Sequence, residues 1–235
     1  MIKDIAIFGF GNMDGNVGIL LNFLDKKFIK RLNCVISLTK QQKNIDIKKE
    51  SRKRYSKKIE FVINNKFYNL PVFDSKNFIK ILKDRKIKKT FIIAKVGKEK
   101  SIVFKKCKKE NIKILSFIHS SVKLIGQNNI GEGTIIFPDC YIGYKSDIGD
   151  GCFIHSGCRI EHHNTIGNFC DINPNLTTGG FTKIGNYCEI NMSVDIINKI
   201  KIGNFSRVGA GSLVLKNVGN KELHYGRPAR FVREN

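Results

Sequence analysis

Residues 142–160 read IGYKSDIGDGCFIHSGCRI, with an isoleucine at every sixth position. Counting in sixes from Ile142 in both directions extends this series over the second half of the chain without a change of phase. Sixteen of its 17 members are aliphatic, and the exception is Thr178. The series consists of Ile118, Leu124, Ile130, Ile136, Ile142, Ile148, Ile154, Ile160, Ile166, Ile172, Thr178, Ile184, Ile190, Ile196, Ile202, Val208 and Val214. An α-helix repeats every 3.6 residues and a strand every two, so neither produces this period.

Two further positions follow the same period. The residue after the aliphatic one is often glycine, and the residue four after it is usually small. This pattern resembles the hexapeptide repeat of left-handed parallel β-helices, in which three hexapeptides form one triangular coil. In that fold the aliphatic residue fills the interior, the small residue fits the corner, and glycine tolerates the turn. One coil cannot bury its own apolar face, so coils must stack. We therefore predict a left-handed parallel β-helix over residues 118–235.

The first half of the chain alternates strands with helices. A β-branched strand over residues 3–10 runs into a glycine-rich turn, and an apolar stripe of helical spacing follows it. The remaining expected elements are strands over 33–38, 90–96 and 112–117, extended segments within 60–72, a helix capped by Asp74, a helix over 98–110, and a flexible basic excursion over 40–58. This alternation predicts a small parallel sheet in a Rossmann-like α/β domain.

Charge divides the chain near residue 118. Residues 1–117 hold 30 lysines and arginines against 10 acidic residues, a net charge of +20, whereas residues 118–235 hold 12 against 10, a net charge of +2. We place the domain boundary there, giving domains 1–117 and 118–235. The excess charge fits either solvated helix faces or the attraction of a phosphorylated sugar.

Several partners and compartments are not expected. The sequence has neither zinc-finger spacing nor an RNP-like aromatic motif, so no nucleic-acid partner is predicted. It has no run of 18 apolar residues, and its N-terminus is a poor signal peptide, so we expect a cytoplasmic protein without a transmembrane segment. Five of the seven cysteines occupy the small corner position of the repeat, which indicates reduced, structural thiols.

Taken together, the two halves resemble the bacterial sugar acyltransferases that include the sialic-acid O-acetyltransferases and the UDP-4-amino-sugar N-acetyltransferases. The resemblance covers nearly the whole chain. The stretches that carry it are residues 5–11, 91–94, 117–122, 160–167 and 226–230. It implies a homotrimer that transfers an acetyl group from acetyl-CoA, bound between neighbouring prisms, to a nucleotide-linked sugar in surface glycan biosynthesis.

The resemblance assigns His162 to the role of catalytic base. The repeat agrees, because His162 follows Ile160 by two and so occupies neither the interior nor the corner position. An outward imidazole can accept a proton at neutral pH. His163 stands where relatives carry an acidic residue that orients the base, and we include it in the catalytic site. We expect Glu161 to point to the opposite face of a strand.

The resemblance also assigns binding roles. It places Asp171, Met192 and Ala210 at the acetyl-CoA site, and Gly9, Gly11, Asn12 and His155 at the substrate. The glycine-rich turn at Gly9 is a natural phosphate site at a helix N-terminus, although a βα turn that needs glycine only for its geometry is an equal reading. The acidic pair by which relatives contact the nucleotide is replaced by Ser37 and its neighbours, so the nucleotide is left open.

Other readings are kept as alternatives. We favour N-acetylation of a 4-amino sugar, because a free amine is the better nucleophile, and O-acetylation is the second choice. A zinc carbonic anhydrase-like prism would use His119 and His155, two coils apart, but its third ligand would fall at the interior Ile160. A prism that serves only as an assembly module is a further alternative. No metal is expected.

Overall fold

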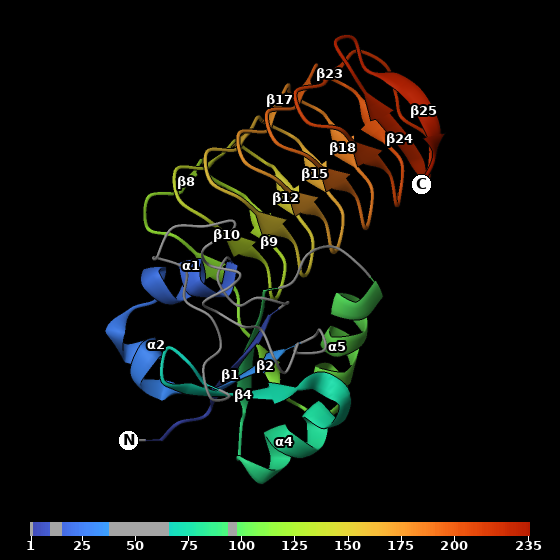
Figure 1. The fold of residues 1–235 in the computed structure, drawn as a ribbon. Coiled ribbons are helices and arrows are strands. Elements are labelled where there is room, and N and C mark those ends of the chain that lie inside the picture. Colours follow the sequence, from blue (N-terminus) through green and yellow to red (C-terminus); the bar gives the residue numbers. More distant parts are fainter. Residues whose placement is uncertain (1, 10–15, 38–65, 94–97) are drawn as a thin grey trace, which may run out of the picture. The chain divides into compact units, whose positions relative to one another are not determined.

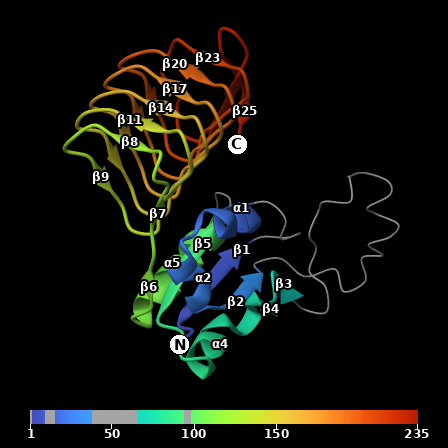
Figure 2. The same cartoon turned by 90° about the vertical axis from the view of Figure 1, so that its left-hand side faces the viewer.

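The computed structural model describes residues 2–9, 16–37, 66–93 and 98–235 (Figures 1 and 2). The chain forms two compact units. The first comprises Met1–Ala94 and Lys105–Ile114, and the second comprises Lys95–Phe104 and Leu115–Asn235. Helix α5 (Lys98–Lys109) therefore contributes to both. The predicted basic excursion over 40–58 and the substrate residues Gly11 and Asn12 lie outside the described residues.

The first unit is built on a six-stranded sheet with the order β3-β4-β2-β1-β5-β6. Its strands are β1 (Ile5–Gly9), β2 (Leu32–Ser37), β3 (Lys66–Phe67), β4 (Leu70–Asp74), β5 (Lys89–Ile93) and β6 (Lys113–Ile114). All neighbours pair in parallel except β3, which forms an antiparallel hairpin with β4. The predicted small parallel sheet is confirmed, with one antiparallel strand added at its edge.

Helices cover both faces of this sheet. They are α1 (Asn16–Phe23), α2 (Lys26–Arg31), the short 3₁₀ helix η1 (Ser75–Asn77), α4 (Phe78–Asp84) and the last part of α5. Phe8 of β1 packs edge-to-face on Phe78 of α4, at 5.2 Å between ring centroids. Phe91, the register partner of Ile7, instead contacts Phe28 of α2 at 6.0 Å. Because Ile7 and Phe8 point to opposite faces of the strand, α2 and α4 lie on opposite sides of the sheet.

The second unit consists of stacked coils whose strands form three parallel sheets (Figure 1). The strands of the coils are β7 (Phe117–Ile118), β8 (Lys123–Leu124), β9 (Asn129–Ile130), β10 (Ile135–Ile136), β11 (Tyr141–Ile142), β12 (Asp147–Ile148), β13 (Phe153–Ile154), β14 (Arg159–Ile160), β15 (Thr165–Ile166), β16 (Asp171–Ile172), β17 (Thr177–Thr178), β18 (Lys183–Ile184), β19 (Glu189–Ile190), β20 (Asp195–Ile196), β21 (Lys201–Ile202), β22 (Arg207–Val208) and β23 (Leu213–Val214). Each strand from β7 to β20 pairs with the one a full coil later, as Ile142 pairs with Ile160. The predicted left-handed parallel β-helix is confirmed.

The aliphatic series fills the interior of the prism. Its members from Ile136 to Val214 are at most 3% exposed, Thr178 included. Ile118 and Leu124 are 38% and 42% exposed, because the stack begins with their coil. The five corner cysteines belong to the same core, and all seven cysteines of the chain are buried and free of disulfides.

The corner side chains also bond one coil to the next. Cys152 donates its thiol hydrogen to the carbonyl of Gly167 at 3.0 Å, and Ser146 donates its hydroxyl to the carbonyl of Glu161 at 2.7 Å. Thiol and hydroxyl groups are small and can donate, so they satisfy a carbonyl that the turn leaves free. Cys, Ser and Thr thus suit the corner because they are small and because they can bond the carbonyl of the next coil.

Glycine in the repeat is required for space, contrary to our expectation that it serves the turn. The positive φ angles fall on the second residue of each turn, such as Lys145, rather than on the glycine that follows the aliphatic residue. A Cβ atom on Gly143 would come within 2.7 Å of the backbone of Glu161 and His162 in the next coil. The close approach of neighbouring coils thus excludes a side chain there.

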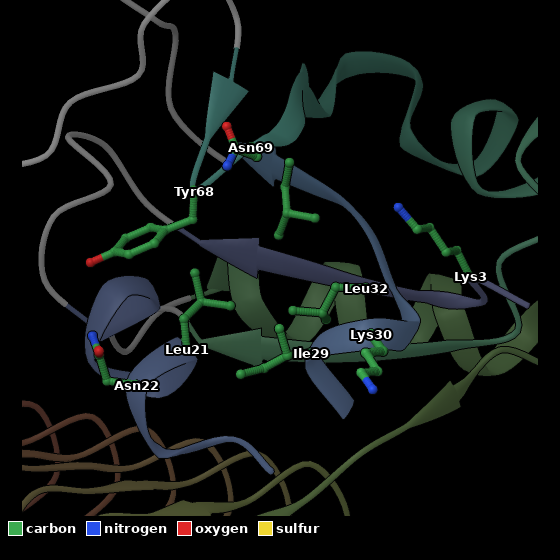
Figure 3. Close-up of a pocket in the computed structure, with 9 residues that line it drawn as sticks. Lys3, Leu21, Asn22, Ile29, Lys30, Leu32, Tyr68 and Asn69 are labelled. Carbon is green, nitrogen blue, oxygen red and sulfur yellow. The ribbon is translucent and has the colours of Figure 1, made fainter. Parts of the chain in front are cut away.

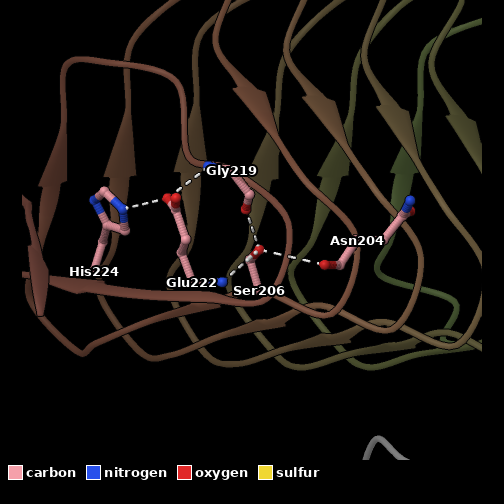
Figure 4. Close-up of polar contacts among 5 residues, drawn as sticks. All are labelled: Asn204, Ser206, Gly219, Glu222 and His224. Atoms are coloured by element: carbon pink, nitrogen blue, oxygen red, sulfur yellow. Dashed lines mark hydrogen bonds and ion pairs between the residues drawn. The ribbon is translucent and has the colours of Figure 1, made fainter. Parts of the chain in front are cut away.

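The C-terminal end of the prism is closed by a polar cluster (Figure 4). Strand β24 (Glu222–Tyr225) pairs in parallel with β22 and antiparallel with β25 (Arg230–Glu234), which ends the stacking. The carboxylate of Glu222 accepts a hydrogen bond from the backbone N–H of Gly219 at 2.7 Å and lies 2.8 Å from Nε2 of His224. The bond from His224 lowers the pKa of Glu222. His224 thereby has a structural role in this cap.

Within the described residues, no helix combines the length and the apolar character that crossing a bilayer requires.

Candidate active site

His162 and His163 occupy a corner of the prism. They form the turn between β14 and β15, and His163 has a left-handed backbone with φ of 57°. The expectation that a strand directs Glu161 to the opposite face is wrong, because β14 ends at Ile160 and Glu161 already belongs to the connection. His162 is exposed, as predicted from its place in the repeat.

The two imidazoles contact each other through their Nδ1 atoms, which lie 3.1 Å apart. One Nδ1 must carry the hydrogen of this bond, and the other must offer its lone pair. The ring of His163 is held in turn by Phe181, which stacks on it at 4.8 Å, and by Tyr144, whose ring meets it edge-on at 5.8 Å. The pair is therefore fixed by aromatic packing, and His163 partners His162 directly.

Gly180 makes room for the ring of His162. It lies one coil after His162 in the same corner, and a Cβ atom there would come within 2.5 Å of Cε1 and 2.7 Å of Nε2. The ring of Phe181 meets that of His162 edge-on at 5.3 Å. Any side chain at Gly180 would push the imidazole out of its present position.

A buried polar pair lies beneath this corner, and our reading of the sequence overlooked it. Asn164 and Thr178, both 2% exposed, are joined by a hydrogen bond of 2.6 Å from Nδ2 to Oγ1. Thr178 also accepts the backbone N–H of Glu161 at 3.1 Å, and Asn164 accepts that of Thr182 at 2.6 Å. The pair thus fixes the backbone of Glu161 just before the histidines, and it ties Asn164 just after them to the backbone of the next coil. Its signal in the sequence is that Thr178 alone interrupts the aliphatic series.

A second polar cluster lies on the sheet that contains β13 and β16. Nε2 of His155 lies 3.5 Å from Oδ1 of Asp171, and the His155 ring sits 4.0 Å from that of Phe153. Asp171 is 1% exposed, and no described residue donates a hydrogen bond to either of its carboxylate oxygens. Lys100, from the part of α5 that belongs to this unit, is 2% exposed and interacts electrostatically with Asp171. Two buried titratable groups, Lys100 and Asp171, therefore lie together with the half-buried His155.

Burial lowers the pKa of Lys100 to about 8, although the negative charge of Asp171 acts in the opposite direction. Desolvation penalises the charged form of the amine, and the counter-charge of Asp171 recovers only part of that cost. The carboxylate of Asp171 is buried. Its contact with acetyl-CoA stays a prediction, and the burial of the side chain does not favour it.

The other predicted residues are distributed over the molecule. Met192 and Ala210 are exposed on neighbouring coils of a different corner, where the N–H of Gly211 bonds the carbonyl of Met192 at 2.9 Å. Gly9 ends β1 in the first unit and packs directly against Val17 of α1. Within one copy of the second unit, the histidine pair and the pair formed by Met192 and Ala210 are thus held on separate corners.

In the parts of the chain that the structure describes, no three His, Cys, Asp or Glu side chains are grouped so that they could hold a metal ion.

The buried amine predicts a pH-dependent stability. The folded pKa of Lys100 is below its unfolded value, so the unfolded chain binds more protons between the two pKa values and stability rises with pH there. Relative to a Lys100→Met variant, we expect the wild-type free energy of unfolding to increase by about 2 kcal/mol between pH 7 and pH 9.5. Denaturant titrations of both proteins at each pH measure this difference. A difference that is constant or that falls with pH would contradict the assignment.

Comparisons with known proteins agree with this architecture. The family model of the bacterial transferase hexapeptide, which has six repeats, matches residues 129–162. No curated protein matches the sequence.

Three solved structures share the fold. PerB from Caulobacter crescentus, in complex with CoA and GDP-perosamine, aligns with a TM-score of 0.80 at 18% identity over 99% of both chains. The acetyltransferase domain of PglB from Neisseria gonorrhoeae, in complex with acetyl coenzyme A, aligns with a TM-score of 0.73 at 14% identity over 99% of this chain and 100% of that one. WeeI from Acinetobacter baumannii aligns with a TM-score of 0.51 at 16% identity over 97% of this chain and 100% of its own. The chain therefore carries the bacterial transferase hexapeptide repeat and has, over nearly its whole length, the fold of PerB and of the acetyltransferase domain of PglB.

Proposed function

We propose that the protein is an acetyl-CoA-dependent acetyltransferase that acts on the amino group of a nucleotide-linked sugar. The observation that carries this proposal is the exposed imidazole of His162, held through Nδ1 by His163 on a hexapeptide prism. It is supported by the complexes of PerB with CoA and GDP-perosamine and of PglB with acetyl coenzyme A, which have the same fold.

The reaction needs a base at the acceptor amine. The amine nitrogen attacks the thioester carbonyl, a C–N bond forms, and His162 takes the proton that the nitrogen releases. The tetrahedral intermediate then collapses, the C–S bond breaks, and the sulfur leaves as a thiolate that receives a proton to give CoA. If Nδ1 of His162 carries the hydrogen of the bond to His163, its Nε2 has a free lone pair for this transfer.

His163 acts as a positioning residue in this scheme. As a neutral acceptor it fixes the tautomer and the ring orientation of His162, as a carboxylate does in many histidine bases. It cannot supply the negative charge that would stabilise the imidazolium. An amine acceptor depends less on a strong base than a hydroxyl does, because the amine is already nucleophilic at neutral pH. This difference favours N-acetylation over O-acetylation.

The remaining assignments belong to the same proposal. Acetyl-CoA would lie along the prism near Met192 and Ala210, and the first unit would bind the phosphates through Gly9, Gly11 and Asn12. His155 would contact the sugar. Because one copy separates the histidine corner from the corner of Met192 and Ala210, we propose a homotrimer, in which faces of neighbouring prisms complete the site.

The first test follows the release of free CoA thiol. We expect the purified protein to release CoA from acetyl-CoA in the presence of a GDP- or UDP-linked 4-amino sugar. His162→Ala should reduce kcat by about 10²–10⁴-fold, because it removes the base. The matching sugar with a hydroxyl in place of the amine distinguishes N- from O-transfer. If no nucleotide sugar releases thiol above background, or if the alanine variant is equally fast, the proposed function is wrong.

The second test separates the acceptor role of His163 from its bulk. His163→Asn keeps a side-chain acceptor and tolerates the left-handed backbone, whereas His163→Leu has neither property. We expect the leucine variant to lose about ten-fold or more in kcat and the asparagine variant to lose less, with similar KM values. Steady-state kinetics over a range of pH measure both. Equal losses in the two variants would refute a hydrogen-bonding role.

The third test uses Gly180. Gly180→Ala should displace the imidazole of His162 and reduce kcat by about ten-fold or more, because a small misplacement of a catalytic group is costly. In the background of His162→Ala the same substitution should have almost no further effect, since the ring that it displaces is absent. A double-mutant cycle on kcat measures the coupling. Additive losses would show that Gly180 acts independently of His162.

A further inference from the structure

An apolar hollow opens on the first unit, and nothing in the proposed reaction uses it (Figure 3). Its volume is about 640 Å³. Leu21, Ile29 and Leu32 turn toward one another at its centre, and Tyr68 closes it beyond Leu21. No acidic side chain lines it among the described residues. Its size lies within the range of small-molecule sites, and its lining is mostly aliphatic.

The hollow is separate from the predicted phosphate site. Leu32 and Leu70 begin the parallel strands β2 and β4, and Lys3 precedes β1. The hollow therefore lies at the amino-terminal edge of the sheet. Gly9 ends β1 at the opposite, carboxyl-terminal edge, where ligands bind in open α/β sheets.

Two lysines, Lys3 and Lys30, flank the hollow on the side of Leu32. Their side chains extend in different directions, and their ammonium groups do not converge on one point (Figure 3). They are therefore not arranged to clamp a single small anion. They suit two separate anionic groups.

The neighbouring acidic groups are already engaged within the protein. Asp4 accepts two hydrogen bonds from the guanidinium of Arg31, at 2.9 and 2.6 Å, and its pKa is lowered by that contact. The side chain of Asp25 caps α2 by accepting the N–H of Lys27 at 2.9 Å. Basic residues still outnumber acidic ones here, since Lys3 and the four basic residues of α2 face only Asp4 and Asp25, so this edge retains a net positive charge.

Helix α2 adds exposed apolar groups to this basic edge. Its sequence is KKFIKR, and none of its residues is buried. Phe28 and Ile29 are 37% and 43% exposed, Tyr68 is 41% exposed, and Ile2 next to Lys3 is 79% exposed. Exposed apolar side chains beside a net positive charge are typical of surfaces that lie in the interface of a membrane. A soluble anion would not require them.

We propose that this basic-apolar edge, formed by Ile2, Lys3, Ile29, Lys30 and Tyr68, binds the surface of a bilayer that contains anionic phospholipids. Lys3 and Lys30 contact separate phosphate headgroups, and Ile29 and Tyr68 enter the boundary between headgroups and acyl chains. The hollow between them receives the apolar part of a lipid. Attraction to the anionic surface and burial of the apolar groups act together, so the loss of either weakens binding.

Vesicle flotation of the full-length protein tests this proposal. We expect co-flotation with vesicles of phosphatidylcholine and phosphatidylglycerol, and little with phosphatidylcholine alone. Lys3→Glu/Lys30→Glu should weaken the binding to anionic vesicles by about 25-fold or more, since each basic group near such a surface contributes about five-fold. Ile29→Ser/Tyr68→Ser should weaken it as well, with no change in net charge. Raising the salt concentration should weaken the wild type progressively.

A matched control separates this edge from net charge. Lys76→Glu/Lys80→Glu makes the same change of charge on the exposed lysines of η1 and α4, on the opposite face of the sheet from α2. We expect this control to bind anionic vesicles nearly as well as the wild type. Thermal unfolding of all variants verifies that they are folded.

Three outcomes would overturn the proposal. The wild type fails to float with anionic vesicles, or the control variant loses as much binding as Lys3→Glu/Lys30→Glu. In the third outcome, the wild type binds single-stranded RNA instead, and Lys3→Glu/Lys30→Glu abolishes that binding, which would identify a nucleic-acid surface. Acetyl transfer is measured separately, so the failure of either proposal leaves the other intact.

Discussion

The parallel hydrogen bonding between coils is the constraint on which the second unit depends. Each strand from β7 to β23 is two residues long and pairs in parallel with a counterpart 18 residues away, as Ile142 does with Ile160. One coil therefore sets the position of every side chain in the next. The aliphatic residue of each repeat points inward, where stacking of the coils removes it from water. Chemistry is left to the turn residues and the outward positions, and the histidine pair occupies one of these turns.

The otherwise apolar interior contains a polar pair directly beneath that turn. A buried polar pair costs free energy unless its members are satisfied, and Asn164 and Thr178 are satisfied by each other and by the backbone of Glu161 and Thr182. A valine at Thr178 would continue the series and leave Asn164 without its acceptor. The hydroxyl of Thr178 thus gives up some apolar burial, and in return its hydrogen bonds fix the backbone of the corner. If His162 is the base that we propose, such rigidity is useful, because a base acts only within a narrow range of positions.

The sequence predicts the prism almost completely and the candidate site only in part. A period of six permits one packing, so strand positions, the buried series and the exposed place of His162 all follow from it. The reason for the glycines does not follow from the sequence, because a glycine in a repeat does not reveal whether torsion or space requires it, and at Gly143 it is the backbone of the next coil that leaves no space. The cluster of Lys100, Asp171 and His155 was not foreseen either. It joins a helix to two strands distant in sequence, and no local pattern encodes such a meeting.

The two histidine environments in the second unit follow different physical rules. His155 faces a buried carboxylate at 3.5 Å, whereas His162 faces another imidazole at 3.1 Å. A carboxylate stabilises an imidazolium through charge, and an imidazole does so only through its lone pair. A base whose partner is neutral returns its proton more readily than one paired with a carboxylate. In the proposed acetyl transfer, the group that removes the amine proton during attack is in place to return it to the departing sulfur. A neutral partner for His162 suits that exchange, provided that the acceptor brings its own nucleophilicity.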